Sequence, residues 1–249
     1  MTSELRKIIV LEFKRNNLVY VDKIGEILEV YADLLISENK KYNLTSITTP
    51  QDIVDKHFID SILGFEKFKK KNPKISPLVV MDIGTGAGFP GIPLLLYDQI
   101  CNNGKAIKEI NLVDSNKKKT EFLSLIVDIL SKSLGKNLIS IHNDRLETLK
   151  LREKTPDLFL SRATGSIDKV LDHLAEFLIK NGQIYNTAFL LYYGGVNVQS
   201  LEKEYVCKGK TESGRKVQFY VSMEIIAEFE FSIENYSRIN IMYSLNPGT

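Results

Sequence analysis

The stretch that decides the fold is "PLVVMDIGTGAGFPGIP", residues 77–93. An apolar run, typical of a parallel strand buried on both faces, leads into a turn with glycine at alternate positions, Gly84, Gly86 and Gly88. Glycine has no Cβ atom, so it permits positive φ and lets a ligand approach the backbone. In open α/β sheets, ligands bind beyond the carboxyl ends of the strands. The stretch therefore predicts a strand, a ligand-binding turn and a helix, with a tight turn that holds no ligand as the alternative.

The spacing of the glycines distinguishes between nucleotide-binding motifs. The dinucleotide fingerprint G-x-G-x-x-G requires glycine where Phe89 stands, and the P-loop requires lysine after its last glycine, whereas Ile92 follows Gly91. The pattern G-x-G-x-G behind the acidic Asp82 resembles motif I of class I S-adenosylmethionine-dependent methyltransferases. A nucleoside cofactor needs an acidic residue at the end of the next strand, for its ribose hydroxyls, and Asp114 stands there. The alternative for Asp114 is a cap of the helix that begins near residue 117.

The remaining segments predict an α/β fold with two parts. Residues 1–75 are expected to form a helical N-terminal extension, in which Thr49 caps a helix that starts at Pro50 and turns Phe58 inward. Residues 76–249 are expected to form the main domain, in which strands alternate with helices near residues 117–133 and 167–180. The strand segments are "LVVMDI", "EINLVD", "LISIH", "DLFLSR" and "GQIYNTAFL". The tail segments "VQFYVSMEIIAEF" and "SRINIMYSL" predict a final antiparallel pair.

Composition limits the class of protein. The 249 residues carry a net charge of +2, so any basic patch that binds nucleic acid has to be local. Cys101 and Cys207 lie far apart, which indicates a reducing compartment, and the three scattered histidines argue against a metal site. The charged N-terminus is no signal peptide, and the apolar stretches are shorter than the roughly 20 residues that span a bilayer. We therefore expect a cytoplasmic protein that binds neither metal nor membrane.

A wider resemblance rests on six blocks of sequence. Between residues 40 and 182 lie the blocks "YNLTSI", "KHFIDSI", "DIGTGAGFPGIPL", "LVDSNKKKTEFL", "DRLE" and "SRA". A weaker match is "SRINI" near the C-terminal end. Their order and spacing resemble the bacterial 16S rRNA guanine-N7 methyltransferases, the ribosomal RNA small subunit methyltransferase G or glucose-inhibited division protein B family. The resemblance implies a class I methyltransferase fold, Rossmann-like, with a mostly parallel sheet, an antiparallel final strand and a helical N-terminal extension. It also implies S-adenosylmethionine as cofactor and 16S rRNA or the small-subunit particle as partner. We further expect a monomer.

The resemblance also implies site residues. The residues expected at the cofactor are Asp82, Gly84, Gly86 and Phe89 of the glycine turn, Asp114, Leu146 and Glu147 beside the adenine, and Arg162 at the methionine side, where the guanine enters.

A second set of residues is expected to face the RNA. His57 is on helix pattern alone a packed histidine, but its block makes it an RNA-binding candidate together with Arg162. Lys117, Lys118 and Lys119 are further candidates, preferred over the lysines at 69–71 because they follow Asp114 at the ligand end of the sheet.

The proposed chemistry needs alignment rather than proton transfer. Guanine N7 keeps its lone pair at neutral pH, so we assign no catalytic acid or base and no metal, and the enzyme has to hold donor and acceptor in line. Two positions depart from the family pattern. The segment "AFLLYYGG" lacks a Lys-Gly pair, and Glu121 stands where relatives often have arginine. The alternatives are a methyltransferase with another substrate and a non-enzymatic RNA-binding assembly factor, while a nicotinamide-dependent oxidoreductase is disfavoured by Phe89.

Overall fold

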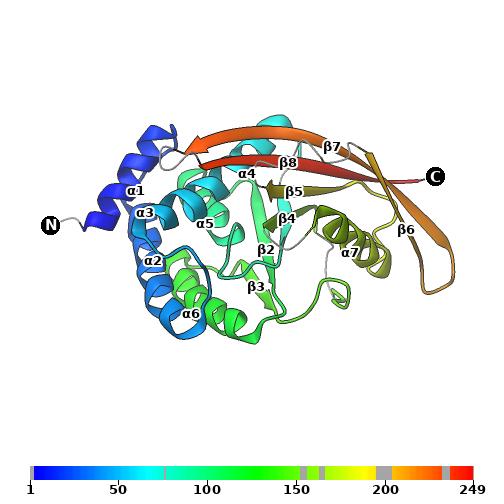
Figure 1. Ribbon diagram of the computed structural model, residues 1–249, viewed down its shortest axis with the longest axis horizontal. Helices are drawn as coiled ribbons and strands as arrows, with labels where there is room; N and C mark the ends of the chain where they lie inside the picture. The colour runs from blue at the N-terminus through cyan, green and yellow to red at the C-terminus, as the bar shows by residue number, and fades with distance from the viewer. Residues whose placement is uncertain are drawn as a thin grey trace.

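The computed structural model describes residues 3–75, 77–151, 156–162, 166–194, 204–231 and 236–248. Within them the strands form one eight-stranded sheet in the order β3-β2-β1-β4-β5-β8-β7-β6 (Figure 1). The parallel part consists of β1 (Leu78–Ile83), β2 (Ile107–Val113), β3 (Ile139–His142), β4 (Leu158–Arg162) and β5 (Ala188–Gly194). The antiparallel part consists of β8 (Tyr236–Pro247), β7 (Lys216–Phe231) and β6 (Glu204–Lys210). The predicted fold class, α/β with a mostly parallel sheet, is confirmed.

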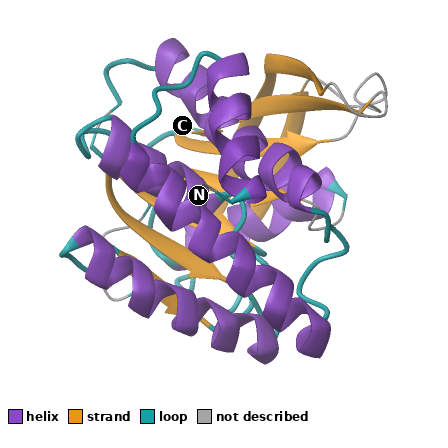
Figure 2. Ribbon diagram, turned by 90° about the vertical axis from the view of Figure 1, so that its left-hand side faces the viewer, coloured by secondary structure: helices purple, strands orange, loops and turns teal. Residues whose placement is uncertain are grey.

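Helices cover both faces of the sheet. One face carries α4 (Asp60–Lys71), α5 (Gly91–Cys101) and α6 (Lys117–Leu134), against which α1 (Glu4–Arg15) and α2 (Asp22–Tyr42) pack (Figure 2). The other face carries α7 (Ile167–Lys180). Because both faces are covered, every residue of β1 is buried, with Val80 toward the first set of helices and Met81 toward α7. This central strand leads directly into the glycine turn.

The helical run from Pro50 to Lys71 brings polar side chains into the interior. The Thr49 hydroxyl accepts a hydrogen bond from the backbone N–H of Asp52, so the predicted cap is confirmed. After α3 (Pro50–Asp52) the helix widens into a π-helical segment, η1 (Ile53–Ile59), before it continues as α4. Short π-helical segments occur mostly inside α-helices and are frequent at functional sites. Here His57 and Asp60 are both buried, and their side chains belong to the network described below.

The N-terminal helices share one apolar core with the sheet. Buried residues of α1, α2 and α4 belong to the same cluster as residues of β1, β2 and β4. Among the described residues, no helix is long and apolar enough to cross a membrane.

The C-terminal part differs from the prediction in two places. The segment "GQIYNTAFL" becomes a strand only at Ala188, because Gly182 ends α7 at φ +72° and the Gln183 N–H donates to the Leu178 carbonyl. The predicted antiparallel pair is confirmed as β7 and β8, but β6 was not predicted. β6 is an edge strand in which exposed residues flank the buried Cys207, and the glycine pair at residues 194 and 195 is too far before it to mark its start. It forms with β7 a hairpin that projects from the sheet (Figure 1).

Candidate cofactor pocket and the buried network beneath it

A cavity of about 440 Å³ lies at the carboxyl ends of the parallel strands. Its lining comes from four segments, namely the end of β1, the end of β2 with the start of α6, the loop after β3, and the first turns of α7. The strand order changes direction between β1 and β4, which is the position where open α/β sheets bind their ligands. The volume is in the range of pockets that bind small molecules, about 300–1,000 Å³.

The glycines of the turn have different surroundings. Gly84 and Gly86 have φ of +63° and +62°, and Gly88 has +100°. A Cβ atom on Gly86 would meet only the Lys119 Nζ atom, at 4.0 Å, so space is open above it. A Cβ atom on Gly88 would lie 2.5 Å from the Ile92 Cδ1 and Tyr31 hydroxyl atoms. The turn therefore needs glycine at 86 for its backbone conformation and at 88 for packing as well.

Asp82 lies beneath the turn rather than in the cavity lining. It is fully buried, and its Oδ2 atom accepts hydrogen bonds from the Thr85 hydroxyl (2.6 Å) and the Gly91 N–H (2.8 Å). Burial raises the pKa of Asp82 to about 7, although both hydrogen bonds act in the opposite direction. Asp82 thus joins the two ends of the glycine turn.

Asp114 connects the turn to the second strand. Its carboxylate accepts hydrogen bonds from the N–H groups of Gly86 (2.9 Å) and Asn116 (2.8 Å), and it lines the cavity with 8% exposure. The cap of α6 is Asn116, whose side chain accepts from the Lys118 N–H, so the helix-cap alternative for Asp114 is wrong. Asp114 is held in place by backbone donors at the rim of the cavity.

The loop after β3 forms the opposite wall. Leu146 is buried and Glu147 is partly exposed, and both line the cavity. The Glu147 carboxylate lies 3.9 Å from the His173 Nδ1 atom. Lys180 donates to the backbone carbonyls of Glu147 and Thr148, which ties the loop to the end of α7.

Arg162, His57 and Phe89 form a buried group next to this edge. The Arg162 guanidinium donates to the Lys56 carbonyl and to the His57 Nδ1 atom, each over 2.8 Å. The His57 and Phe89 rings stack in parallel with centroids 4.0 Å apart, and the guanidinium lies 5.4 Å from the Phe89 centroid. Phe89 also stacks on Tyr31 of α2. The cofactor candidate Phe89, 4% exposed, therefore joins the N-terminal helices to the turn.

The hydrogen bonds of His57 define its protonation. Because Nδ1 accepts from Arg162, the ring proton is on Nε2, which lies 3.1 Å from the Thr45 hydroxyl oxygen. Burial lowers the pKa of His57 well below its usual value, and the charges of Arg162 and Arg238 lower it further. His57 is therefore a neutral, packed histidine in this structure.

Asp60 balances two guanidinium groups inside the protein. Its Oδ2 atom lies 3.5 Å from the Arg162 Nη1 atom and 3.4 Å from the Arg238 Nε atom of β8. Asp60 is fully buried, and the side chains of Arg162 and Arg238 are 8% and 14% exposed. Burial raises the pKa of Asp60, and the two guanidinium groups act in the opposite direction. These ion pairs link the start of α4 to β4 and β8 at one end of the sheet.

The lysine candidates separate into different environments. Lys119 lines the cavity and lies 3.9 Å from the Asp114 carboxylate, whereas Lys117 is 81% exposed and lies 3.9 Å from Glu121. Lys118 is exposed at the start of α6. Of the less favoured run, Lys69 pairs with Glu66, and the end of α4 lies at the amino edge of the sheet, before β1.

The structure thus divides most of the expected site residues into two groups, while Gly86, Lys117 and Lys118 belong to neither. The lining of the cavity contains Gly84, Asp114, Lys119, Leu146 and Glu147. The residues placed beneath or beside it are Asp82, Phe89, His57 and Arg162.

Sequence reasoning missed the partners of this second group, chiefly Asp60 and Arg238. Both lie in quoted blocks, "KHFIDSI" and "SRINI", but their pairing depends on the tertiary fold. In the segment without the Lys-Gly pair, Tyr193 is buried and donates to the Ser61 carbonyl, while position 195 lies outside the described residues.

Comparisons with known proteins point to the same family as the six sequence blocks. The family model described as rRNA small subunit methyltransferase G matches residues 24–217. A ribosomal RNA small subunit methyltransferase G of Mesoplasma florum is 36% identical over 68% of this chain and 66% of its own length. One of Clostridium botulinum, strain Okra, is 32% identical over 84% of this chain and 80% of its own length. The alignment with the Mycoplasma capricolum relative covers 65% of that protein, so this chain spans somewhat less than two thirds of some relatives.

Solved structures are much more distant. M. jannaschii TYW2 in complex with AdoMet superposes with a TM-score of 0.43 at 13% identity, over 74% of this chain and 76% of that chain, which is too low to support an argument. The family assignment depends on the sequence relatives and the family model, whose match covers most of the chain. The chain belongs to the rRNA small subunit methyltransferase G family.

Proposed function

We propose that this protein transfers a methyl group from S-adenosylmethionine to N7 of a guanine in 16S rRNA, and that this guanine is the one at position 527. The observation that carries the proposal is the cavity in which the glycine turn, Asp114 and the "DRLE" loop meet at the carboxyl edge of the sheet. These three segments are separate in the sequence, and each belongs to a block of the methyltransferase pattern. An rRNA substrate would place the reaction in the cytoplasm.

The residues of the cavity fit a nucleoside cofactor. The open space above Gly86 and the positive φ of Gly84 allow a ligand to approach the turn. Asp114 and Glu147 offer carboxylate oxygens to hydroxyl and amino groups, while Leu146 offers an apolar surface to an adenine ring. We expect Asp114 to accept hydrogen bonds from the ribose and Leu146 and Glu147 to flank the adenine.

The chain's own residues position the acceptor rather than remove a proton. When bound, S-adenosylmethionine supplies an electrophilic methyl group. His57 is neutral and donates from Nε2, and its Nδ1 lone pair is engaged by Arg162, so it is not available as a base. Asp60 and the His57–Phe89 stack hold the Arg162 guanidinium at the end of β4. We propose that Arg162 orients the guanine or the methionine carboxylate from that position.

Methylation of purified RNA tests the proposal. The protein is incubated with S-adenosylmethionine and 16S rRNA or small subunits from a strain that lacks the gene, and the RNA is then treated with borohydride and aniline, which cut at N7-methylguanosine. We expect a single protein-dependent cleavage. RNA from the deletion strain that is already cleaved at this position would contradict the assignment.

Matched variants connect the reaction to the cavity. Asp114→Ala should weaken S-adenosylmethionine binding in calorimetry by at least tenfold, because it removes the carboxylate at the rim. Asp128→Ala, at an exposed acidic residue of α6 outside the lining, should bind as the wild type does. If the protein binds 16S rRNA but shows neither cofactor binding nor methyl transfer, the non-enzymatic assembly factor becomes the better assignment.

A further inference from the structure

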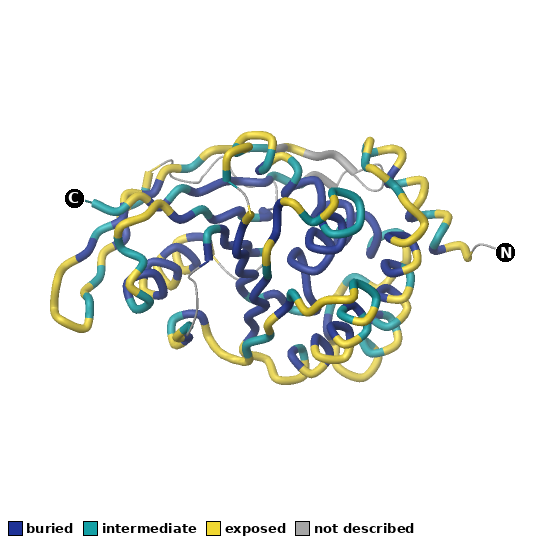
Figure 3. Tube along the Cα trace, turned by 180° about the vertical axis from the view of Figure 1, so that it is seen from behind, coloured by how far each residue is buried: buried dark blue, intermediate teal, exposed yellow. Residues whose placement is uncertain are grey.

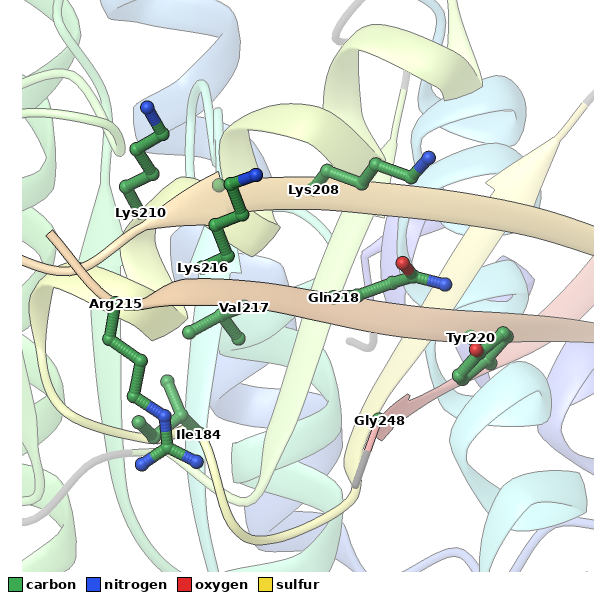
Figure 4. A pocket seen from close by; sticks show the side chains of 10 residues that line it. Ile184, Lys208, Lys210, Arg215, Lys216, Val217, Gln218, Tyr220 and Gly248 are labelled. Carbon is green, nitrogen blue, oxygen red and sulfur yellow. The ribbon is translucent and has the colours of Figure 1, made fainter.

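The β6–β7 hairpin carries a basic face far from the cofactor pocket. In its register Lys210 is opposite Lys216, and Lys208 is opposite Gln218. Residues directly opposite in an antiparallel pair lie on the same face. Figure 4 shows the side chains of Lys208, Lys210 and Lys216 extending from one side of the hairpin. The opposite face packs Cys207, Val217 and Phe219 into the core with α7, so the orientation of the lysines is set by the fold.

A cavity of about 770 Å³ lies at this hairpin. It forms where β7 extends beyond β8, since the pairing of these strands begins only at Phe219 and Pro247. Among the described residues no carboxylate lines it, and the lining consists of Ile184, Lys208, Gly209, Lys210, Arg215, Lys216, Val217, Gln218, Tyr220 and Gly248.

Among the described residues, the cations Lys208, Lys210, Arg215 and Lys216 form no salt bridge, and all four are exposed. The turn that joins β6 to β7 is largely exposed as well (Figure 3). The acidic residue of the connecting turn, Glu212, pairs instead with Lys150, at 2.9 Å. Like charges directly opposite each other destabilise a strand pair, so Lys210 and Lys216 favour an anion between them.

Two exposed tyrosines lie beside these cations. Tyr185 is 69% exposed and Tyr220 is 55% exposed. Arg215 lies over the Tyr185 ring, 5.6 Å from its centroid, and donates to its hydroxyl over 2.9 Å. Exposed aromatic rings beside lysine and arginine provide stacking surfaces for bases and donors for phosphates, which is the combination found in surfaces that bind single-stranded nucleic acid.

We propose that this basic end of the hairpin, with Lys208, Lys210 and Lys216 on one side, Arg215 and Tyr185 on the other, and Tyr220 beside them, is a second contact for the backbone of the RNA substrate. Lysines two residues apart on a strand are separated by roughly 7 Å, a spacing on which a phosphodiester chain can place successive anions. The identity of the RNA rests on the proposed function. The contact with RNA backbone itself rests on the charges and rings of the hairpin.

The hairpin face and the cofactor pocket lie at opposite edges of the sheet. β7 begins at Lys216, beyond the amino end of β5, whereas the cofactor pocket lies at the carboxyl ends of the strands. The face is therefore remote from the transferred methyl group. It should increase RNA affinity and leave S-adenosylmethionine binding and the rate at saturating RNA unchanged.

The test replaces three lysines, Lys208→Gln, Lys210→Gln and Lys216→Gln, in the full-length protein. Lys23→Gln, Lys132→Gln and Lys136→Gln form the matched control, because these residues are exposed and the loss of charge is the same. Binding of transcribed 16S rRNA and of an unrelated structured RNA is measured by fluorescence anisotropy over a range of salt concentrations. Circular dichroism and calorimetry with S-adenosylmethionine show that each variant is folded and binds its cofactor.

We expect the hairpin variant to lose at least tenfold in affinity for both RNAs at low salt. A plot of the logarithm of the RNA association constant against the logarithm of the salt concentration should become less steep by about 2 to 3. Three lysines are removed, and each phosphate contact contributes roughly 0.7 to 0.9 to the steepness. The control should lose less than threefold. Equal affinity and slope for the hairpin variant and the wild type would overturn the proposal.

Further outcomes separate this proposal from the proposed function. If the wild type methylates 16S rRNA and the hairpin variant binds RNA equally well, only the hairpin proposal fails. If the wild type neither binds nor methylates 16S rRNA, both fail. If the variant loses binding to phosphatidylserine vesicles but keeps RNA binding, the face belongs to an anionic membrane and the proposal is wrong.

Discussion

At the carboxyl edge of the sheet, the side chains of Asp60, Arg162 and Arg238 lie inside the protein, and the Asp60 carboxylate pairs with both guanidinium groups. On the β6–β7 hairpin the cations lie in solvent and have no acidic partner among the described residues. Burial makes an unpaired charge costly, so the interior network has to be complete. At the hairpin the cations are solvated, so an unpaired charge costs little there, and these cations remain available to bind a ligand. The stability of the fold should therefore depend on the first region and hardly at all on the second.

The largest expected effect is at Asp60. Asp60→Ala leaves two buried guanidinium groups without their carboxylate and should lower the free energy of unfolding by about 3–5 kcal/mol. Urea titration followed by circular dichroism measures the change, with Lys216→Gln as the matched change at the hairpin. If Asp60→Ala lowers the free energy of unfolding no more than Lys216→Gln does, the buried network does not stabilise the fold more than the hairpin cations do.

The glycine turn provides a second test of the buried region. Gly88→Ala should lower the free energy of unfolding by about 2–4 kcal/mol, because the new Cβ atom meets Ile92 and Tyr31 and the residue has positive φ. Gly86→Ala has only the backbone cost and should lose about 1 kcal/mol. Thermal or urea unfolding of both variants measures the difference. Equal losses would show that packing at Gly88 contributes nothing.

Asp82 makes the buried region sensitive to pH. Its pKa rises from 3.8 to about 7 on folding, so the folded state keeps a proton that the unfolded state releases between these values. The stability contributed by the neutral form is fully present below pH 3.8 and is lost as pH rises through 7, with a slope of at most about 1.4 kcal/mol per pH unit. Asp82→Asn removes this dependence.

Unfolding of both proteins in urea from pH 4.5 to 8 measures this effect. The stability of the wild type relative to Asp82→Asn should fall up to pH 7 and be constant above it. A difference that does not change with pH would contradict the protonation of Asp82, while a difference that rises with pH would reverse its sign.

The smallest expected effect is at the tip of the hairpin. Lys150 and Glu212 form an ion pair with side chains 63% and 81% exposed, and such pairs contribute little to stability. Lys150→Ala should leave the midpoint of urea unfolding unchanged within error. A clear shift of the midpoint would show that charges on the hairpin are coupled to the fold.

The sequence predicted the elements that depend on local chemistry. The Thr49 cap, the buried strand before the glycine turn and the positive φ of Gly84, Gly86 and Gly88 follow from the residues themselves. The start of β5 and the presence of β6 did not follow, because an edge strand with alternating exposed residues resembles a polar loop in the sequence. The same holds for the hairpin face, which exists only once β6 pairs with β7.

For the candidate site, the sequence by itself determined which segments meet. Parallel strands end at one edge of a sheet, so the glycine turn and Asp114 were expected to lie together once the alternation of strands and helices was recognised, while the family resemblance placed the "DRLE" loop beside them. Only the tertiary structure decided that Phe89 and His57 stack beneath this edge and that Asp60 pairs with Arg238. The physical reason is that backbone conformation depends on neighbouring residues, whereas the burial and pairing of a side chain depend on what the rest of the chain places over it.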